Sequence, residues 1–125
     1  MVKTIISMAV VFCLLVGFAI FEVTIVNKQF DEFEVELNTL YEKMENESAT
    51  EDDLYRLQES WWSKKSFLHA FIPHNEIREF DLWIADAIVF VREKEWSDAI
   101  SKIEVLLTLT HEAPRSFLLN FSNVF

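Results

Sequence analysis

The hydrophobic and polar positions divide the chain into one unbroken apolar run and a series of amphipathic segments. No charged residue occurs from Thr4 to Phe21. Apolar residues then recur alternately four and three positions apart, at Val26, Phe30, Phe33, Leu37, Leu40 and Met44. This spacing places the side chains in one stripe along a helix that packs against other helices. Because neither Gly nor Pro occurs between Gly17 and Pro73, we predict one long helix across both parts.

The run from Thr4 to Phe21 has the length of a single membrane span. As a helix its 18 residues measure about 27 Å, close to the roughly 30 Å hydrocarbon core of a bilayer. A cleaved secretory signal, which would release a secreted helical binding module, is the alternative. The run is longer than a usual signal core, however, and Gly17-Phe18-Ala19 is a poor cleavage site. We therefore predict a transmembrane anchor over residues 1–26 and a helical extramembrane domain over residues 27–125.

A second helix is predicted to begin after Thr50, which can cap it, and to carry acidic residues in its first turn. Its apolar face is formed by Leu54, Leu57, Trp61 and Leu68. Because Pro73 lacks an amide hydrogen and disfavours helical geometry at the preceding residue, this helix should end near Phe71.

A third helix, capped by His74 or Asn75, and a fourth helix that ends before Pro114 complete the prediction. The third carries the stripe Ile77, Phe80, Ile84, Ala87, Ile88 and Val91, and the fourth carries Trp96, Ala99, Ile100, Ile103, Leu106 and Leu107. Short connections favour antiparallel neighbours, so the fold class is all-α, an up-and-down bundle of about four helices. The last two helices resemble one tetratricopeptide hairpin, which we interpret as common helix packing.

Charge narrows the classes of partner. The net charge is −10, and all 21 acidic residues lie from Glu22 onward. No basic stripe is present to neutralise phosphates, which excludes nucleic acid as an expected partner. Two positive groups, Lys3 and the amino terminus, precede the apolar run, and only Lys28 follows it closely. The positive-inside rule therefore favours a cell-membrane protein with a cytoplasmic N-terminus and an extracytoplasmic domain. The single cysteine, Cys13, lies within the run and allows no intramolecular disulfide.

Chemistry-bearing motifs are sparse. His69, His74 and Glu76 could suggest a metal-dependent enzyme or metal sensor, but Pro73 interrupts the helix between the two histidines, so no common face is expected. No nucleophile elbow, phosphate loop or paired-cysteine motif occurs. We therefore expect no catalysis and no cofactor.

Three groups of residues are candidates for protein interaction. Trp62 stands beside the core position Trp61 but points elsewhere on the helix. The His74-Asn75-Glu76 segment follows the Pro73 break. The tail from Ser116 alternates apolar and other residues with a strand-like period and contains Phe117, Phe121 and Phe125.

The chain also resembles a known family over nearly its whole length. The resemblance is carried by the N-terminal anchor, Leu37-Asn38-Thr39-Leu40-Tyr41, Trp61-Trp62 with Lys64-Lys65, Phe71-Ile72-Pro73-His74-Asn75-Glu76-Ile77, Asp81-Leu82-Trp83 and Ala99-Ile100-Ser101-Lys102-Ile103-Glu104. It is similar to the small membrane-anchored proteins catalogued as domain of unknown function 4363, found mostly in spore-forming Gram-positive bacteria. The resemblance implies a companion role beside a polytopic membrane protein, and it brings no catalytic residues.

The sequence therefore predicts a single-pass accessory or interaction subunit of a membrane complex. Its expected partners are the lipid bilayer and a polytopic membrane protein, and self-association into a homo-oligomer stays open.

Overall fold

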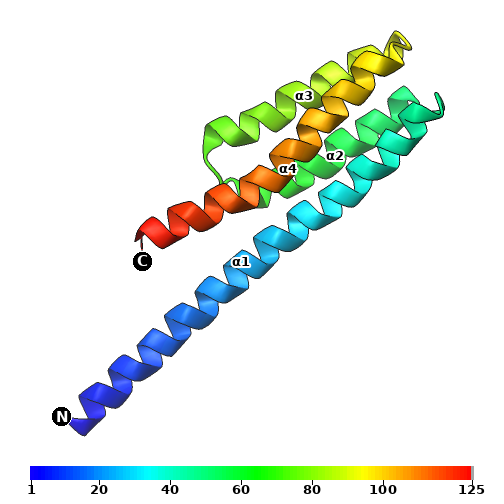
Figure 1. Cartoon of the computed structure of the whole chain (residues 1–125). Coiled ribbons are helices and arrows are strands. Elements are labelled where there is room, and N and C mark those ends of the chain that lie inside the picture. Colours follow the sequence, from blue (N-terminus) through cyan, green and yellow to red (C-terminus); the bar gives the residue numbers. More distant parts are fainter. Residues whose placement is uncertain (125) are drawn as a thin grey trace.

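The computed structural model is all-helical and consists of four helices, α1 (Val2–Glu45), α2 (Glu51–Leu68), α3 (His74–Arg92) and α4 (Trp96–Val124) (Figure 1). It describes the backbone of residues 1–124 and the side chains of residues 1–115. Helices contain 88% of the residues of the chain, and no strand occurs among residues 1–124. The predicted fold class, an all-α protein with an apolar N-terminal helix, is confirmed.

α1 is a single helix of 44 residues, about 66 Å long. Its first part extends away from the other helices (Figure 1), and an 18-residue window there has a mean hydropathy of 2.7 with none of its surface buried. This helix is long and apolar enough to cross a membrane. Its second part is buried along the predicted stripe: Val26, Phe30, Phe33, Leu37, Leu40 and Met44. The prediction of one rod, exposed first and packed later, is confirmed.

The four helices form an antiparallel up-and-down bundle. Each contacts two neighbours, in the cyclic order α1, α2, α3, α4 and back to α1. The α1–α2 and α3–α4 connections lie at one end of the bundle, which we call the far end (Figure 1). The α2–α3 connection lies at the opposite end, nearer to the exposed part of α1. The tetratricopeptide-like character of α3 and α4 stays a prediction.

The start of α2 follows the sequence prediction in detail. The Thr50 hydroxyl accepts a hydrogen bond from the Asp53 backbone N–H, and the Asp53 carboxylate accepts one from the Thr50 backbone N–H, which forms a capping box. Burial opposes ionisation of Asp53, but its bonds to the Thr50 amide and to Lys43 outweigh this and lower the pKa of its carboxyl. α2 therefore begins with a charged carboxylate at its positive end.

The predicted boundaries on either side of Pro73 need correction. α2 ends at Leu68 and not near Phe71, because the backbone N–H groups of Phe71 and Ile72 both turn back to the Leu68 carbonyl. α3 begins at His74 with Pro73 as its N-cap, so neither His74 nor Asn75 caps it. The Pro73 carbonyl accepts from the backbone N–H groups of Glu76 and Ile77, and its extended backbone, at ψ 143°, suits a residue at a helix start.

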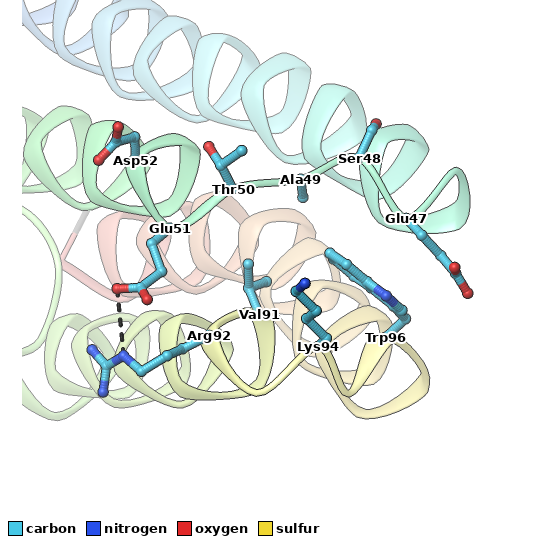
Figure 2. A pocket seen from close by; sticks show the side chains of 10 residues that line it. All are labelled: Glu47, Ser48, Ala49, Thr50, Glu51, Asp52, Val91, Arg92, Lys94 and Trp96. Atoms are coloured by element: carbon cyan, nitrogen blue, oxygen red, sulfur yellow. Dashed lines mark ion pairs between the residues drawn. The ribbon is translucent and has the colours of Figure 1, made fainter.

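Two connections at the far end use left-handed residues that are not glycine. Glu47 follows α1 with φ 55°, and Lys94 follows α3 with φ 57°. In each turn the next amide reaches back over the helix end, from Ser48 to the Lys43 carbonyl and from Glu95 to the Phe90 carbonyl. The two turns lie side by side across a shallow cleft (Figure 2).

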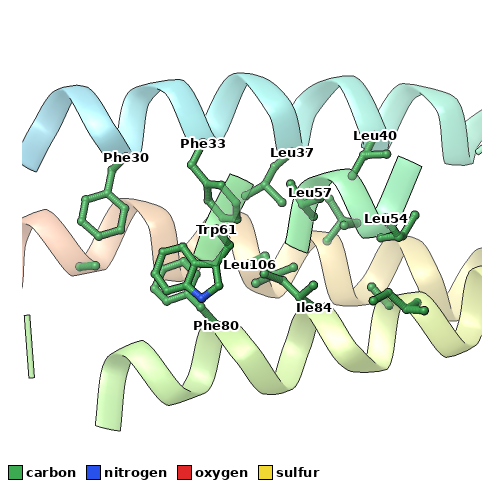
Figure 3. Close-up of a cluster of buried hydrophobic side chains, with 14 of the residues drawn as sticks. Phe30, Phe33, Leu37, Leu40, Leu54, Leu57, Trp61, Phe80, Ile84 and Leu106 are labelled. Carbon is green, nitrogen blue, oxygen red and sulfur yellow. The ribbon is translucent and has the colours of Figure 1, made fainter. Parts of the chain in front are cut away.

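The core contains an aromatic cluster between α1, α2 and α3 (Figure 3). The Trp61 ring stacks on Phe80 with centroids 4.3 Å apart and lies 5.4 Å from Phe33. Trp61 is fully buried, and its indole N–H donates to the Asp81 carboxylate at 2.9 Å. The predicted α3 stripe, Ile77, Phe80, Ile84, Ala87, Ile88 and Val91, is the set of buried residues on that helix.

α4 is longer than predicted. It continues through Pro114 to Val124, so the expectation that it ends before Pro114 is wrong, and so is the strand-like period of the tail. Thr110 and Ala113 are buried against the bundle, and this packing keeps the helix intact where the proline removes one hydrogen bond. Phe117 and Phe121 lie on this helix, but their side chains, and Phe125 altogether, are outside the described residues.

Candidate functional site

Trp62 is the predicted interaction residue whose environment the structure defines best. Half of its surface is exposed, whereas Trp61 is fully buried. Trp62 follows Tyr55 by seven positions and precedes Lys65 by three, so the three residues share one side of α2. The Tyr55 hydroxyl accepts a hydrogen bond from the Arg92 guanidinium of α3 at 3.2 Å. The Lys65 ammonium lies 2.7 Å from the Asp81 carboxylate of α3. Trp62 therefore lies on the side of α2 that borders α3.

α3 carries further exposed apolar residues at the level of Trp62. The antiparallel pairing of Lys65 with Asp81 and of Tyr55 with Arg92 brings Trp62 level with Ala85. Leu82 and Val89 lie about one turn to either side of Ala85 and are 50% and 47% exposed. We call this surface the α2–α3 apolar face, and its residues are Tyr55, Trp62, Leu82, Ala85 and Val89.

Leu82 and Val89 are not among the interaction residues predicted from the sequence. A signal was present, because Leu82, Ala85 and Val89 have helical spacing but lie outside the α3 core stripe. A second apolar row on a helix whose core row is already complete indicates a surface with another purpose. Its juxtaposition with Trp62, however, depends on how α2 and α3 pair in space.

Ionic groups fix the two ends of the α2–α3 apolar face. Lys65 and Asp81 form a half-buried pair at one end. At the other end, Arg92 donates to the Tyr55 hydroxyl and contacts the Glu51 carboxylate at 3.4 Å. The bond to Tyr55, followed by that to Glu51, raises the pKa of Arg92 above its usual value. These pairs hold the two helices in one register and keep the apolar face in one shape.

The structure brings together the two histidines that the sequence analysis had expected to be apart. The His69 and His74 rings stack with centroids 5.6 Å apart and planes 20° apart, because the α2–α3 turn folds back on itself. Both residues and Asn75 are exposed, and Glu76 is half-buried. Among the residues with described side chains, no three His, Cys, Asp or Glu groups are arranged to hold a metal ion. The second interaction candidate therefore lies at the α2–α3 turn, and Phe117 and Phe121 of the third lie on α4.

A cleft of about 430 Å³ opens between the two turns at the far end (Figure 2). Its walls contain Ala49, Val91 and Trp96 together with charged residues of both signs, including Glu51, Arg92 and Lys94. Arg92 is already held by Glu51 across the cleft. Among the predicted interaction residues with described side chains, none lines it.

Comparison with known proteins places the chain in a family. No curated protein and no solved structure matches it. The family described as Domain of unknown function (DUF4363) matches residues 20–124, which include the packed part of α1 and all of α2, α3 and α4. The resemblance seen in the sequence is confirmed, and the chain belongs to the DUF4363 family.

Proposed function

We propose that this protein is a single-pass, membrane-anchored companion subunit that docks on a polytopic membrane protein through the α2–α3 apolar face. One observation carries the proposal. Two sets of apolar side chains, those of the first part of α1 and those of the α2–α3 apolar face, stay exposed although the four helices already enclose a complete core. Exposed apolar surfaces of this kind mark sites of membrane or protein contact.

The anchor is the first part of the proposal. Residues 4–21 contain no charge and make no buried contact within the bundle. Eleven of them are Ile, Val, Leu or Phe, which together favour insertion by about 3 to 7 kcal/mol. The balance of Lys3 against Lys28 supports a cytoplasmic N-terminus and an extracytoplasmic bundle.

The docking face is the second part. Tryptophan is prominent among residues that dominate binding energy, and Trp62 stands between apolar residues with ionic pairs at the borders, as in a protein interface with a polar rim. A membrane tether confines the bundle near other proteins of the same bilayer, which raises the effective concentration of such a partner. A polytopic protein with a loop beside the bundle fits this arrangement.

Site-specific photo-crosslinking and co-purification test the docking face. The full chain with a photoreactive amino acid at Trp62 should crosslink to one membrane protein in native membranes. Val89→Ser should reduce co-purification of that protein in mild detergent. Val35→Ser is the matched control, because Val35 is an exposed valine on α1, outside the face. A solitary monomer under several detergents, or equal effects of the two substitutions, would contradict the proposal.

Extraction of membranes tests the anchor independently. The intact chain should stay in the membrane fraction after washing with alkaline carbonate. Its purified mass should include residues 1–21. Release by carbonate would contradict the anchor, and a mature form that lacks these residues would instead support the secreted binding module.

A further inference from the structure

Two ion pairs and one hydrogen bond between α1 and α2 set the level of each α2 residue along α1. Lys43 of α1 pairs with Asp53 of α2 at 3.2 Å. Glu36 of α1 accepts from the Ser60 hydroxyl of α2 at 2.7 Å. Glu32 of α1 pairs with Lys64 of α2 at 3.5 Å. Steps of seven and then four residues down α1 thus match equal steps along α2. Four residues further, Leu68, the last residue of α2, is level with Lys28.

This register places the α2–α3 turn close to the end of the apolar run. Lys28 lies seven residues, or about 10 Å, beyond Phe21. The turn, residues 69–73, continues from Leu68 toward the N-terminal part of α1 (Figure 1). The headgroup layer of each leaflet is about 5 to 8 Å thick. If residues 4–21 cross the bilayer, Leu68 lies just outside the headgroup layer, and the α2–α3 turn that continues from it toward the span reaches the level of the headgroups.

α4 runs toward the same end of the bundle. Its Glu104 and His111 contact Tyr41 and Glu34 of α1, at 3.4 Å and 3.2 Å, so seven residues along one helix again match seven along the other. Figure 1 shows that the last turns of α4 continue in the direction of the exposed part of α1. Residues 116–125 include no charged side chain.

The composition of the α2–α3 turn suits an interfacial position. Phe67 is 38% exposed, and its ring lies 5.1 Å from that of Phe71. No Asp, Glu, Lys or Arg occurs from Ser66 to Asn75, and the polar groups there include the paired imidazoles of His69 and His74. Phe71 is partly buried against the core, so Phe67 is the more exposed ring of the pair. An exposed aromatic ring beside uncharged polar groups is typical of segments at a membrane surface.

The far end has the opposite composition. Residues 42–53 contain six acidic side chains and Lys43 as their one basic side chain. Glu45, at the end of α1, lies about 36 Å beyond Phe21 along the helix axis, well outside the Debye length of about 8 Å at physiological salt. The acidic residues of the far end therefore lie beyond the reach of an anionic lipid surface.

We propose that the α2–α3 turn, with Phe67 and Phe71, rests in the headgroup layer of the bilayer, so that the bundle stands upright on the membrane. This inference rests on the proposed anchor. α1 has neither Gly nor Pro between the apolar run and the packed part, so the orientation of the span is passed directly to the bundle. The bilayer, and not a second copy of the chain, is the expected occupant of this surface because the surface is continuous with the span. An upright bundle also presents the α2–α3 apolar face sideways, toward a neighbouring membrane protein.

Spin labels at three single cysteines in the full chain, reconstituted into vesicles of phosphatidylcholine and phosphatidylglycerol, test the inference. The native Cys13 reports on the span, and His74→Cys and Ser97→Cys, each with Cys13→Ser, report on the turn and the far end. Both substituted positions are exposed. The readout is the relaxation of each label by a nickel-chelating lipid headgroup and by dissolved oxygen.

The nickel lipid should relax the label at position 74 strongly and the label at position 97 weakly. The label at position 13 should be relaxed by dissolved oxygen, which enters the hydrocarbon core. A water-soluble nickel complex, used as a control, should not relax it. Equal, weak relaxation at positions 74 and 97, with the Cys13 label inside the hydrocarbon core of the bilayer, would overturn the inference and leave the anchor intact. A Cys13 label exposed to water would overturn both.

A matched pair of substitutions supplies a second measurement. Phe67→Glu should cause a loss of nickel-lipid relaxation at position 74, because a carboxylate opposes burial of the turn among anionic headgroups. Val35→Glu, which places the same charge on an exposed α1 residue above the turn, should leave the relaxation unchanged. No loss with Phe67→Glu would contradict a role of the aromatic pair in membrane contact.

Discussion

Replacing Trp61 with alanine should destabilise the bundle far more than replacing its chain neighbour Trp62. Trp61 is fully buried, stacks on Phe80 at 4.3 Å and lies 5.4 Å from Phe33. Removal of a buried tryptophan side chain costs about 3 to 5 kcal/mol, through lost burial and the cavity that is left. Trp62 is half exposed and outside the core, so its replacement should cost less than about 1 kcal/mol.

The hydrogen bond from Trp61 to Asp81 adds little to this difference. The Asp81 carboxylate also accepts from Lys65 at 2.7 Å, so it keeps a charged partner when the indole is removed. Most of the loss should therefore come from packing. For a domain of this size, 1 kcal/mol shifts the melting temperature by about 4 to 8 °C, so Trp61→Ala should lower it by roughly 12 to 40 °C.

The assay is thermal unfolding of the full chain in detergent micelles, followed by near-ultraviolet circular dichroism. This signal reports on fixed aromatic packing, whereas the apolar part of α1 is expected to stay helical in detergent and would mask unfolding at far-ultraviolet wavelengths. Equal shifts for Trp61→Ala and Trp62→Ala would refute the assignment of Trp61 to the core and with it the packing of α2 against α1 and α3.

Three further predictions concern local features. Lys94→Gly should stabilise the bundle by about 1 kcal/mol, because Lys94 has a left-handed backbone at φ 57° that glycine adopts without strain. Glu93→Gly is the control and should destabilise the bundle, because Glu93 has an ordinary backbone at φ −83°. The free energies of unfolding of the two variants are compared by chemical unfolding. Pro114→Ala should raise the melting temperature, because it restores an amide donor within α4 and removes a penalty of up to about 3 kcal/mol; a lower melting temperature would contradict a continuous helix. The pKa of Asp53 is lower in the folded chain than in the unfolded chain, so its ionised carboxylate stabilises the fold at a pH above the unfolded-state pKa. This stability is lost as the pH falls through the folded-state pKa. Asp53→Asn should therefore reduce the acid dependence of unfolding curves measured from pH 7 downward.

Several features of this protein follow from the sequence alone because they depend on interactions between residues close along the chain. The stripe from Val26 to Met44 and the α3 stripe from Ile77 to Val91 were both predicted as the buried rows, since the 3.6-residue period fixes which side chains share a face. Thr50 was identified as a cap because its partner Asp53 lies within the same turn. The apolar run from Thr4 to Phe21 needs no tertiary information at all.

Other features were decided by the packing of the helices. Pro114 would end an isolated helix, but burial of Ala113 on the bundle allows α4 to continue past it. The pairing of His69 with His74 depends on the path of the α2–α3 turn. Likewise, Trp62 is level with Ala85, and so with the stretch from Leu82 to Val89, only through the register of α2 against α3. Local periodicity determines which residues a helix buries, whereas the surfaces through which this protein would act are made by residues from different helices and exist only when the bundle is assembled.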